Sequence, residues 1–163
     1  MADMLVSLLD LEPLDPLLET LRKQDIIIRR AYPFENSRVR AFIESDFGVS
    51  WADEASVAFS RNPVTAYIAI DTSGQEKRIV GFAAYECTCR DYFGPTGVSE
   101  AYRKRGIGKA LLVASLHGLR ELGYAYAIIG GVGNARAFYA KVVGAKVIEE
   151  STPGIYRDLL RSE

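Results

Sequence analysis

The chain has 163 residues, of which 48% are hydrophobic and 25% charged, as is typical of one globular domain with a substantial core. Its 20 basic and 21 acidic residues leave a net charge of −1, which argues against a dedicated nucleic-acid-binding surface. Two cysteines, Cys87 and Cys89, are too few for a structural metal site, and no apolar run is long enough to cross a membrane.

The first 24 residues carry leucines at helical spacing, interrupted by Pro13 and Pro16. They predict two short amphipathic helices, which form a helical extension over residues 1–24 in front of a domain at residues 25–163. We expect this extension to pack on the domain or on a second subunit. The N-terminus lacks the basic start and the uninterrupted apolar stretch of a signal peptide, so we expect a cytoplasmic protein.

From residue 25 onward, strand and helix patterns follow one another in a mixed α/β order. Strands are predicted at residues 25–30, 64–70, 78–85, 93–98, 124–129, 146–150 and 155–160, and helices at 33–43, 51–61, 106–122 and 134–143. Because Pro95 and Gly97 fit a regular ladder poorly, we expect a bulge or a splayed strand at residues 93–98.

Three cations, Arg103, Lys104 and Arg105, run into Gly106 and Gly108 at the point where a helical apolar pattern begins. Glycine leaves backbone N–H groups open to a ligand, and the start of a helix attracts an anion. Residues 103–112 are therefore interpreted as a phosphate cradle. Their spacing lacks the first glycine and the hydroxyl of a P-loop, and it lacks the third small residue of a dinucleotide-binding turn.

Residues 98–112 resemble the acyl-CoA-binding motif of the GNAT superfamily of N-acetyltransferases, and residues 134–141 resemble its second motif. The resemblance covers roughly residues 26–160 as a domain. It implies a mixed, mostly antiparallel sheet with a V-shaped splay, flanked by helices, and acetyl-CoA as co-substrate with no metal. The residues that would hold acetyl-CoA are Val98, Arg103, Lys104, Arg105, Gly106, Ile107, Gly108, Lys109 and Asn134.

Within this resemblance, the backbone of Val98 would pair with the pantetheine arm, and a splay beyond Val98 would open the slot for it. The N–H of Val98 would also polarise the thioester carbonyl. Asn134 either binds the pantetheine or caps its own helix.

Tyr139 resembles the tyrosine of this family that protonates the departing CoA thiolate, with core packing as the alternative interpretation. The acceptor amine has to lose a proton, and Glu86, at the end of a strand, is the first candidate for the base. Asp91 and Glu100 follow it, although for each acid a solvated surface position is favoured over the catalytic role. His117 is assigned to a solvated helix face, and Trp51 either stacks on an acceptor ring or packs in the core.

The leading hypothesis is an enzyme that moves the acetyl group of acetyl-CoA directly to a primary amine of a small molecule. Residues 93–98 resemble GNAT proteins linked to amino-sugar metabolism, which favours a glucosamine-like acceptor. The alternative is a non-catalytic acyl-CoA-binding sensor. A nucleic-acid patch at Arg103–Arg105 is a third interpretation and predicts salt-dependent binding. Family members are often dimers, and the N-terminal extension is compatible with a homodimer.

Overall fold

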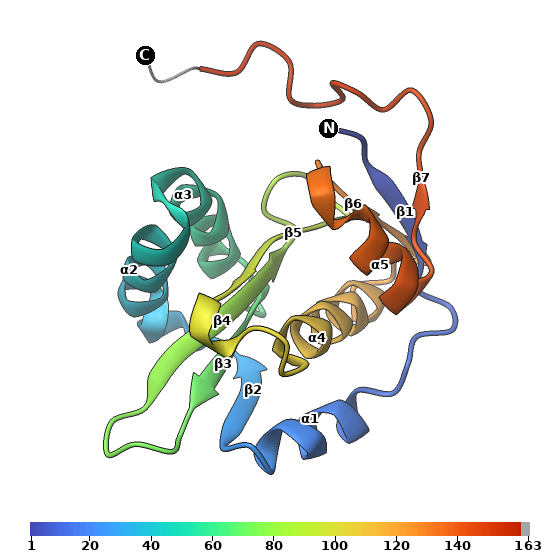
Figure 1. Cartoon of the computed structure of the whole chain (residues 1–163). Coiled ribbons are helices and arrows are strands. Elements are labelled where there is room, and N and C mark those ends of the chain that lie inside the picture. The colour runs from blue at the N-terminus through green and yellow to red at the C-terminus, as the bar shows by residue number, and fades with distance from the viewer. Residues whose placement is uncertain (161–163) are drawn as a thin grey trace.

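Seven strands form one sheet in the computed structural model, which describes residues 1–160 (Figure 1). The strands are β1 (Met4–Ser7), β2 (Ile26–Arg30), β3 (Ala66–Asp71), β4 (Arg78–Tyr85), β5 (Tyr92–Val98), β6 (Tyr126–Ile129) and β7 (Lys146–Val147). The helices are α1 (Leu14–Arg22), α2 (Asn36–Phe47), α3 (Val49–Ser56), α4 (Ile107–Glu121) and α5 (Arg136–Val143). Short 3₁₀ turns are η1 (Pro33–Glu35), η2 (Val57–Ser60), η3 (Glu100–Tyr102) and η4 (Gly133–Ala135).

The sheet has the order β2-β3-β4-β5-β6-β1-β7. Within the described residues, β5 and β6 run parallel and all other neighbouring strands run antiparallel. The predicted mixed α/β class with a mostly antiparallel sheet is therefore confirmed. The helices predicted after residue 30 and the strands predicted between residues 25 and 129 are all present.

The parallel strands β5 and β6 pair at two positions only, Tyr92 with Ile128 and Phe93 with Ile129. Gly94, with φ of +122°, and Pro95, which has no N–H to donate, follow at once and end the pairing. The splay between the strands thus begins after Phe93, earlier than the predicted position beyond Val98. The expected irregularity of β5 is also present as a register shift against β4 between Ala83 and Tyr85.

Each face of the sheet is covered by helices (Figure 1). On one face, buried residues of α4 such as Leu111 and Leu116 pack on Val80 and Tyr85 of β4. On the other face, α2 and α3 bury a second core that is centred on Phe82 of β4. The central strands are consequently buried on both sides, which holds the start of α4 and the splay of β5 in fixed relative positions.

The helix predicted over the first leucines is wrong. Residues Met4–Ser7 form β1, an inner strand that pairs with β6 on one side and β7 on the other. The alternating burial of Met4, Val6 and Leu8 against the exposure of Leu5 and Leu9 has the period of a strand. Only the second predicted helix of this segment exists, as α1. Within residues 1–160, no helix combines the length and the hydropathy needed to cross a bilayer.

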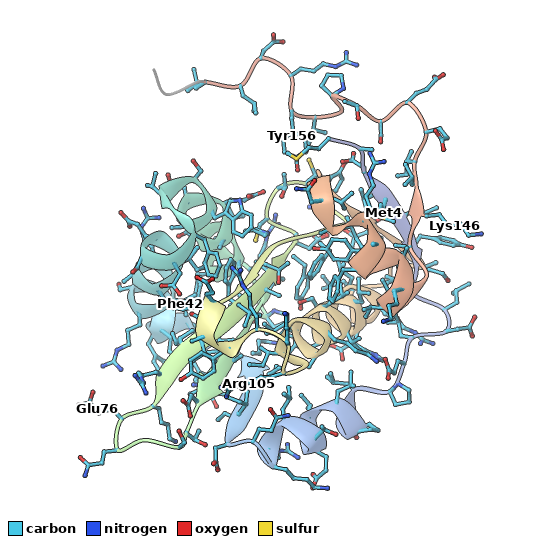
Figure 2. All side chains as sticks on the ribbon, viewed as in Figure 1. Met4, Phe42, Glu76, Arg105, Lys146 and Tyr156 are labelled. Carbon is cyan, nitrogen blue, oxygen red and sulfur yellow. The ribbon has the colours of Figure 1, made fainter. Side chains whose placement is uncertain are left out.

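The strand predicted at residues 155–160 is also absent, and residues 151–160 follow an irregular path. The chain leaves the sheet after β7 and turns at Pro153 and Gly154, two residues that interrupt a regular ladder. In Figure 1 this segment runs from β7 across the top of the molecule, and Figure 2 labels Tyr156 on it. An ideal Cβ on Gly130 would lie 2.9 Å from the Tyr156 hydroxyl, so this phenol rests on the turn that follows β6.

Candidate active site

The turn before α4 presents backbone N–H groups to the surface. Gly106, the N-cap of α4, has φ of +89°, and Lys104 is also left-handed, with φ of +64°. No side chain caps α4. Because the first N–H groups of a helix have no partner inside the helix, those of Ile107 to Lys109 remain available to an anion.

A cavity of about 200 Å³ lies over this turn, and we call it the cradle cavity. Its lining comprises Val98, Tyr102, Arg103, Lys104, Gly106, Ile107, Gly108, Lys109 and Phe138. Of the residues predicted to hold acetyl-CoA, only Arg105 and Asn134 do not line it. An ideal Cβ on Gly108 would point between Val98 and Phe138, at 3.8 Å and 4.0 Å from their side chains, so the missing side chain keeps this cavity open.

The backbone of Val98 faces the splay. The N–H of Ser99 donates to the carbonyl of Val80 on β4. Since successive residues of a strand point their backbone groups to opposite sides, the N–H and carbonyl of Val98 face away from β4. Nε of Arg103 donates to the Val98 carbonyl over 3.2 Å. The N–H of Val98 makes no hydrogen bond to another strand across the described splay.

Two of the predicted cationic side chains already have partners. Nζ of Lys109 forms an ion pair with Glu12 at 2.8 Å, in the segment before α1. The guanidinium of Arg105 lies 4.9 Å from the centre of the Tyr102 ring. The positive field of the cradle therefore rests chiefly on Arg103, Lys104 and the start of α4.

A hydrogen bond fixes the turn that leads into the cradle. The Tyr102 hydroxyl donates to Asp71 at the end of β3 over 2.6 Å. This bond, together with hydrogen bonds from Ser73, lowers the pKa of Asp71 to about 2. The carboxylate is thus ionised at neutral pH and anchors η3 to the central sheet.

Tyr139 lies at the closed end of the splay. Its ring meets Phe93 edge-on at 6.2 Å between centres and Phe138 at 5.3 Å. The residue is 8% exposed, and burial raises its pKa to about 12. The phenol is therefore protonated at neutral pH and can act as a hydrogen-bond donor.

A second cavity, of about 320 Å³, lies at this closed end, and we call it the splay cavity. Its lining comprises Met1, Trp51, Glu54, Thr88, Phe93, Gly94, Pro95, Gly130, Gly131, Val132, Gly133 and Tyr156. Phe93 contributes to this lining and also contacts Tyr139. β5 runs from the splay cavity at Phe93 to the cradle cavity at Val98, so the two cavities lie at the two ends of one strand.

The predicted bases lie outside both cavities. Glu86 is 6% exposed and has φ of +60°, and its carboxylate accepts the N–H of Asp91. Burial and the charge of Glu86 raise the pKa of Asp91 to about 6. Glu100 is exposed on η3. None of these three acids lines a cavity, so the geometry does not favour them, and their catalytic role stays a prediction.

Glu54 is the carboxylate that sequence analysis missed. It lies on α3 and lines the splay cavity together with Trp51, three residues earlier on the same helix face. The signal available in the sequence was this spacing of an aromatic residue and an acid in a predicted helix.

Asn134 and His117 line neither the cradle cavity nor the splay cavity. Asn134 is exposed in η4, and no side chain caps α5, so the helix-cap interpretation of Asn134 is wrong. His117 lies on α4 and donates from Nε2 to the carbonyl of Glu12 at 2.8 Å, away from both cavities. Residues 1–160 contain no group of three or more His, Cys, Asp or Glu side chains arranged to hold a metal ion.

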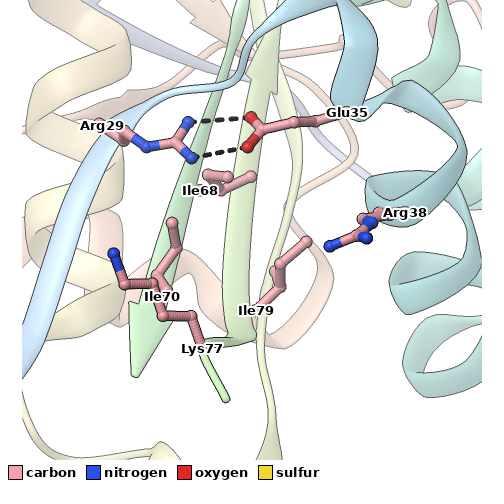
Figure 3. A pocket seen from close by; sticks show the side chains of 7 residues that line it. All are labelled: Arg29, Glu35, Arg38, Ile68, Ile70, Lys77 and Ile79. Carbon is pink, nitrogen blue, oxygen red and sulfur yellow. Dashed lines mark hydrogen bonds and ion pairs between the residues drawn. The ribbon is translucent and has the colours of Figure 1, made fainter. Parts of the chain in front are cut away.

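A third cavity, of about 170 Å³, lies beside α2 and the opposite end of the sheet (Figure 3). Ile68, Ile70 and Ile79 form its floor, and Arg29 closes it with a two-bond ion pair to Glu35 at 2.6 and 2.9 Å. The ion pair lowers the pKa of Glu35 and raises that of Arg29. None of the predicted site residues lies there, so we assign the chemistry to the cradle cavity and the splay cavity.

Residues 63–142 match a family model described as an acetyltransferase (GNAT) domain. The match includes the cradle, β5 and Tyr139. No curated protein matches the chain significantly.

Solved structures share the fold at low sequence identity. A glucosamine N-acetyltransferase region of a fungal multi-domain β-N-acetylglucosaminidase aligns with a TM-score of 0.70 at 17% identity, over 90% of this chain and 19% of that chain. A GCN5-related N-acetyltransferase from Sphaerobacter thermophilus aligns with a TM-score of 0.62 at 20% identity, over 90% of this chain and 48% of that chain. A Drosophila protein aligns with a TM-score of 0.58 at 12% identity, over 90% of this chain and 47% of that chain. This chain spans less than half of each of these proteins.

Proposed function

The chain belongs to the GNAT family of acetyl-CoA-dependent N-acetyltransferases through its domain at residues 63–142, and we propose that it transfers acetyl groups directly to primary amines of small molecules. One observation carries the proposal: a cavity over uncapped helix N–H groups and a cavity with a carboxylate lie at the two ends of β5. The first suits a pyrophosphate and the second suits an ammonium group.

In this proposal, the N–H groups of Ile107 to Lys109 and the side chains of Arg103 and Lys104 bind the pyrophosphate. The backbone of Val98 pairs with the pantetheine arm as an added strand would. The thioester then lies near Phe93, between Tyr139 and the splay cavity. Acetyl-CoA supplies the acyl group, and positioning and charge stabilisation supply the rate.

Tyr139 acts on the leaving group. A thiol has a pKa near ~8.5, whereas the pKa of Tyr139 is about 12, so complete proton transfer from the phenol is unfavourable. Tyr139 therefore stabilises the departing thiolate as a hydrogen-bond donor. The thiolate gains its proton from the amine, which loses that proton when the amide forms.

The test measures CoA release with a thiol reagent from acetyl-CoA and a panel of amines. We expect acceptor-dependent release that falls roughly 100-fold in Tyr139→Phe while acetyl-CoA still binds. Tyr126→Phe is the control, because Tyr126 is a phenol on β6 that lines neither cavity. Release that is unchanged in Tyr139→Phe would contradict its assigned role.

An acyl-CoA sensor without turnover is the second candidate, and the position of Glu86 outside both cavities favours it. It predicts tight acetyl-CoA binding and no acceptor-dependent CoA release.

For the acceptor, we propose an amino sugar of the glucosamine type, supported by Trp51, which is 40% exposed and lines the splay cavity. A homodimer and a cytoplasmic location stay predictions.

A further inference from the structure

The splay cavity contains one carboxylate, that of Glu54, and no basic side chain among its lining residues. We propose that the acceptor is an amine without any anionic group, and that Glu54 binds its ammonium and takes a proton from it. The inference deepens the proposed function and rests on it.

The carboxylate of Glu54 is held in place and still has capacity for a ligand. The Thr88 hydroxyl donates to its Oε1. In the part of the chain that the structure describes, Oε2 makes no hydrogen bond, and no Lys, Arg or His forms an ion pair with Glu54. A carboxylate oriented by one neutral donor and paired with no cation suits an incoming ammonium group.

Trp51 provides the second contact. Its indole stacks on Phe47 at 5.7 Å and 22°, and it meets Phe82 edge-on at 6.4 Å. Phe47 in turn lies against Gly97 of β5, where an ideal Cβ would be 2.6 Å from the Phe47 ring. The indole is thus supported from β5, while 40% of the residue stays exposed. Such a rigid ring suits the apolar face of a sugar or the ring of an arylalkylamine.

The charge of the cavity sets the class of acceptor. A carboxylate or phosphate on the acceptor would lie near Glu54 with no Lys, Arg or His side chain in the lining to compensate it. Like charges brought together in a partly desolvated site are unfavourable, and this repulsion is a source of specificity. Amino acids and amino-sugar phosphates are therefore poor acceptors, whereas amino sugars and simple arylalkylamines are good ones.

The reaction balances with this assignment. Glu54 takes one proton from the ammonium, and the freed nitrogen lone pair attacks the thioester carbonyl carbon. The C–N bond forms and the C–S bond breaks. The nitrogen gives its second proton to the thiolate, which leaves as the CoA thiol, and Glu54 releases its proton to solvent.

The test compares matched acceptors at saturating acetyl-CoA: glucosamine with glucosamine 6-phosphate, and tyramine with tyrosine. We expect kcat/KM to be at least about tenfold higher for the anion-free member of each pair. Equal or reversed values in both pairs would overturn the proposal while leaving the transferase function intact. No turnover of any amine, with acetyl-CoA still bound, would instead refute the proposed function.

Variants of Glu54 test its role separately. Below the pKa of the amine, log kcat/KM in Glu54→Gln should rise with pH with a slope near 1, because only the neutral amine then reacts, and wild type should be less steep. Glu54→Lys should raise the relative kcat/KM for the anionic member of each pair. Both variants should retain acetyl-CoA affinity. An unchanged pH profile in Glu54→Gln would overturn the role even if Glu54→Lys failed to fold.

The matched control is Glu76→Gln. Glu76 lies at the tip of the hairpin between β3 and β4 (Figure 2) and lines neither cavity. We expect it to change neither the pH profile nor the acceptor preference. A shift equal to that of Glu54→Gln would attribute the effect to net charge and would overturn the assignment.

Discussion

Gly108 keeps the first turn of α4 open to a ligand. A Cβ at this position would make ordinary contacts with Val98 and Phe138, so the fold accommodates alanine. We expect Gly108→Ala to leave the unfolding free energy unchanged or raised by up to about 1 kcal/mol. The same methyl would enter the cradle cavity and weaken acetyl-CoA binding about tenfold or more, as expected for overpacking of a site.

Calorimetric titration with acetyl-CoA and urea unfolding check the two halves of this prediction. Gly74→Ala, in the β3–β4 hairpin, is the control and should change neither quantity much. Full acetyl-CoA affinity in Gly108→Ala would mean that no ligand approaches this turn closely.

Asp91 is expected to make stability depend on pH. Its pKa is about 6 in the fold, raised by burial and by Glu86, against 3.8 for the ordinary side chain. Between these values the folded state holds a proton that the unfolded state has lost, so stability falls as pH rises from about 4 through 6. Asp91→Asn removes this loss, and asparagine tolerates the left-handed backbone found there.

We therefore expect Asp91→Asn to be more stable than wild type above pH 6, with the difference shrinking as pH approaches 4. Urea midpoints measured across this range check the prediction, with Glu76→Gln as a charge control. A difference that stays constant with pH would show that ionisation of Asp91 is not its cause.

At the scale of elements, α4 and β4 approach closely at Gly118. A Cβ there would lie 2.6 Å from Cζ of Tyr85, whose ring fills the space between the helix and the sheet. Gly118→Ala would normally favour a helix by about 1 kcal/mol. Here we expect a net loss of roughly 1–3 kcal/mol of unfolding free energy, because the ring cannot move without disturbing the core.

Urea unfolding of Gly118→Ala checks this expectation. The double variant with Tyr85→Phe is the informative control, because the Tyr85 hydroxyl is the nearest atom to the added methyl. Gly118→Ala should cost less unfolding free energy in the Tyr85→Phe background than it costs in the wild-type protein. An increase in stability for the single variant would contradict the close approach.

Local signals explain why some elements were predictable. The glycines and apolar periodicity of residues 106–122 predict α4, and the anion-binding role proposed for its start, without any long-range information. The positions of Glu54 and Glu86, in contrast, could not be predicted from local signals. Glu86 was a candidate because it follows a predicted strand, but its left-handed backbone breaks the strand pattern immediately after β4. The position of Glu54 on a cavity depends on the splay of β5 and on the return of the C-terminal segment, neither of which a local pattern encodes.

At the scale of the whole molecule, both ends of the described chain reach the splay cavity. Met1 precedes β1 and Tyr156 follows β7, and both residues line the cavity. Strand β1 was not predictable because Leu5, Leu8 and Leu9 satisfy a helical spacing. Only pairing with β6 and β7, more than a hundred residues away, selects the strand.

Two substitutions in β1 distinguish the strand from the predicted helix. Val6 is fully buried, so Val6→Glu should destabilise the protein by roughly 3–5 kcal/mol or prevent folding, because it buries an unpaired charge. Leu5 is 40% exposed, and Leu5→Glu should cost less than about 1 kcal/mol. Soluble yield and urea unfolding measure both effects, and similar losses in the two variants would contradict the alternation.

The splay after Phe93 also links ligand binding to folding. From Gly94 to Val98, β5 lacks a neighbour on its β6 side, so a molecule bound there supplies hydrogen-bond partners that the chain does not. Such a molecule binds the native state and not the unfolded chain. At 100 times its dissociation constant it would add about 2.7 kcal/mol to the unfolding free energy. At a fixed ligand concentration, the melting temperature of the protein therefore reports the affinity of any molecule that binds along this open edge of β5.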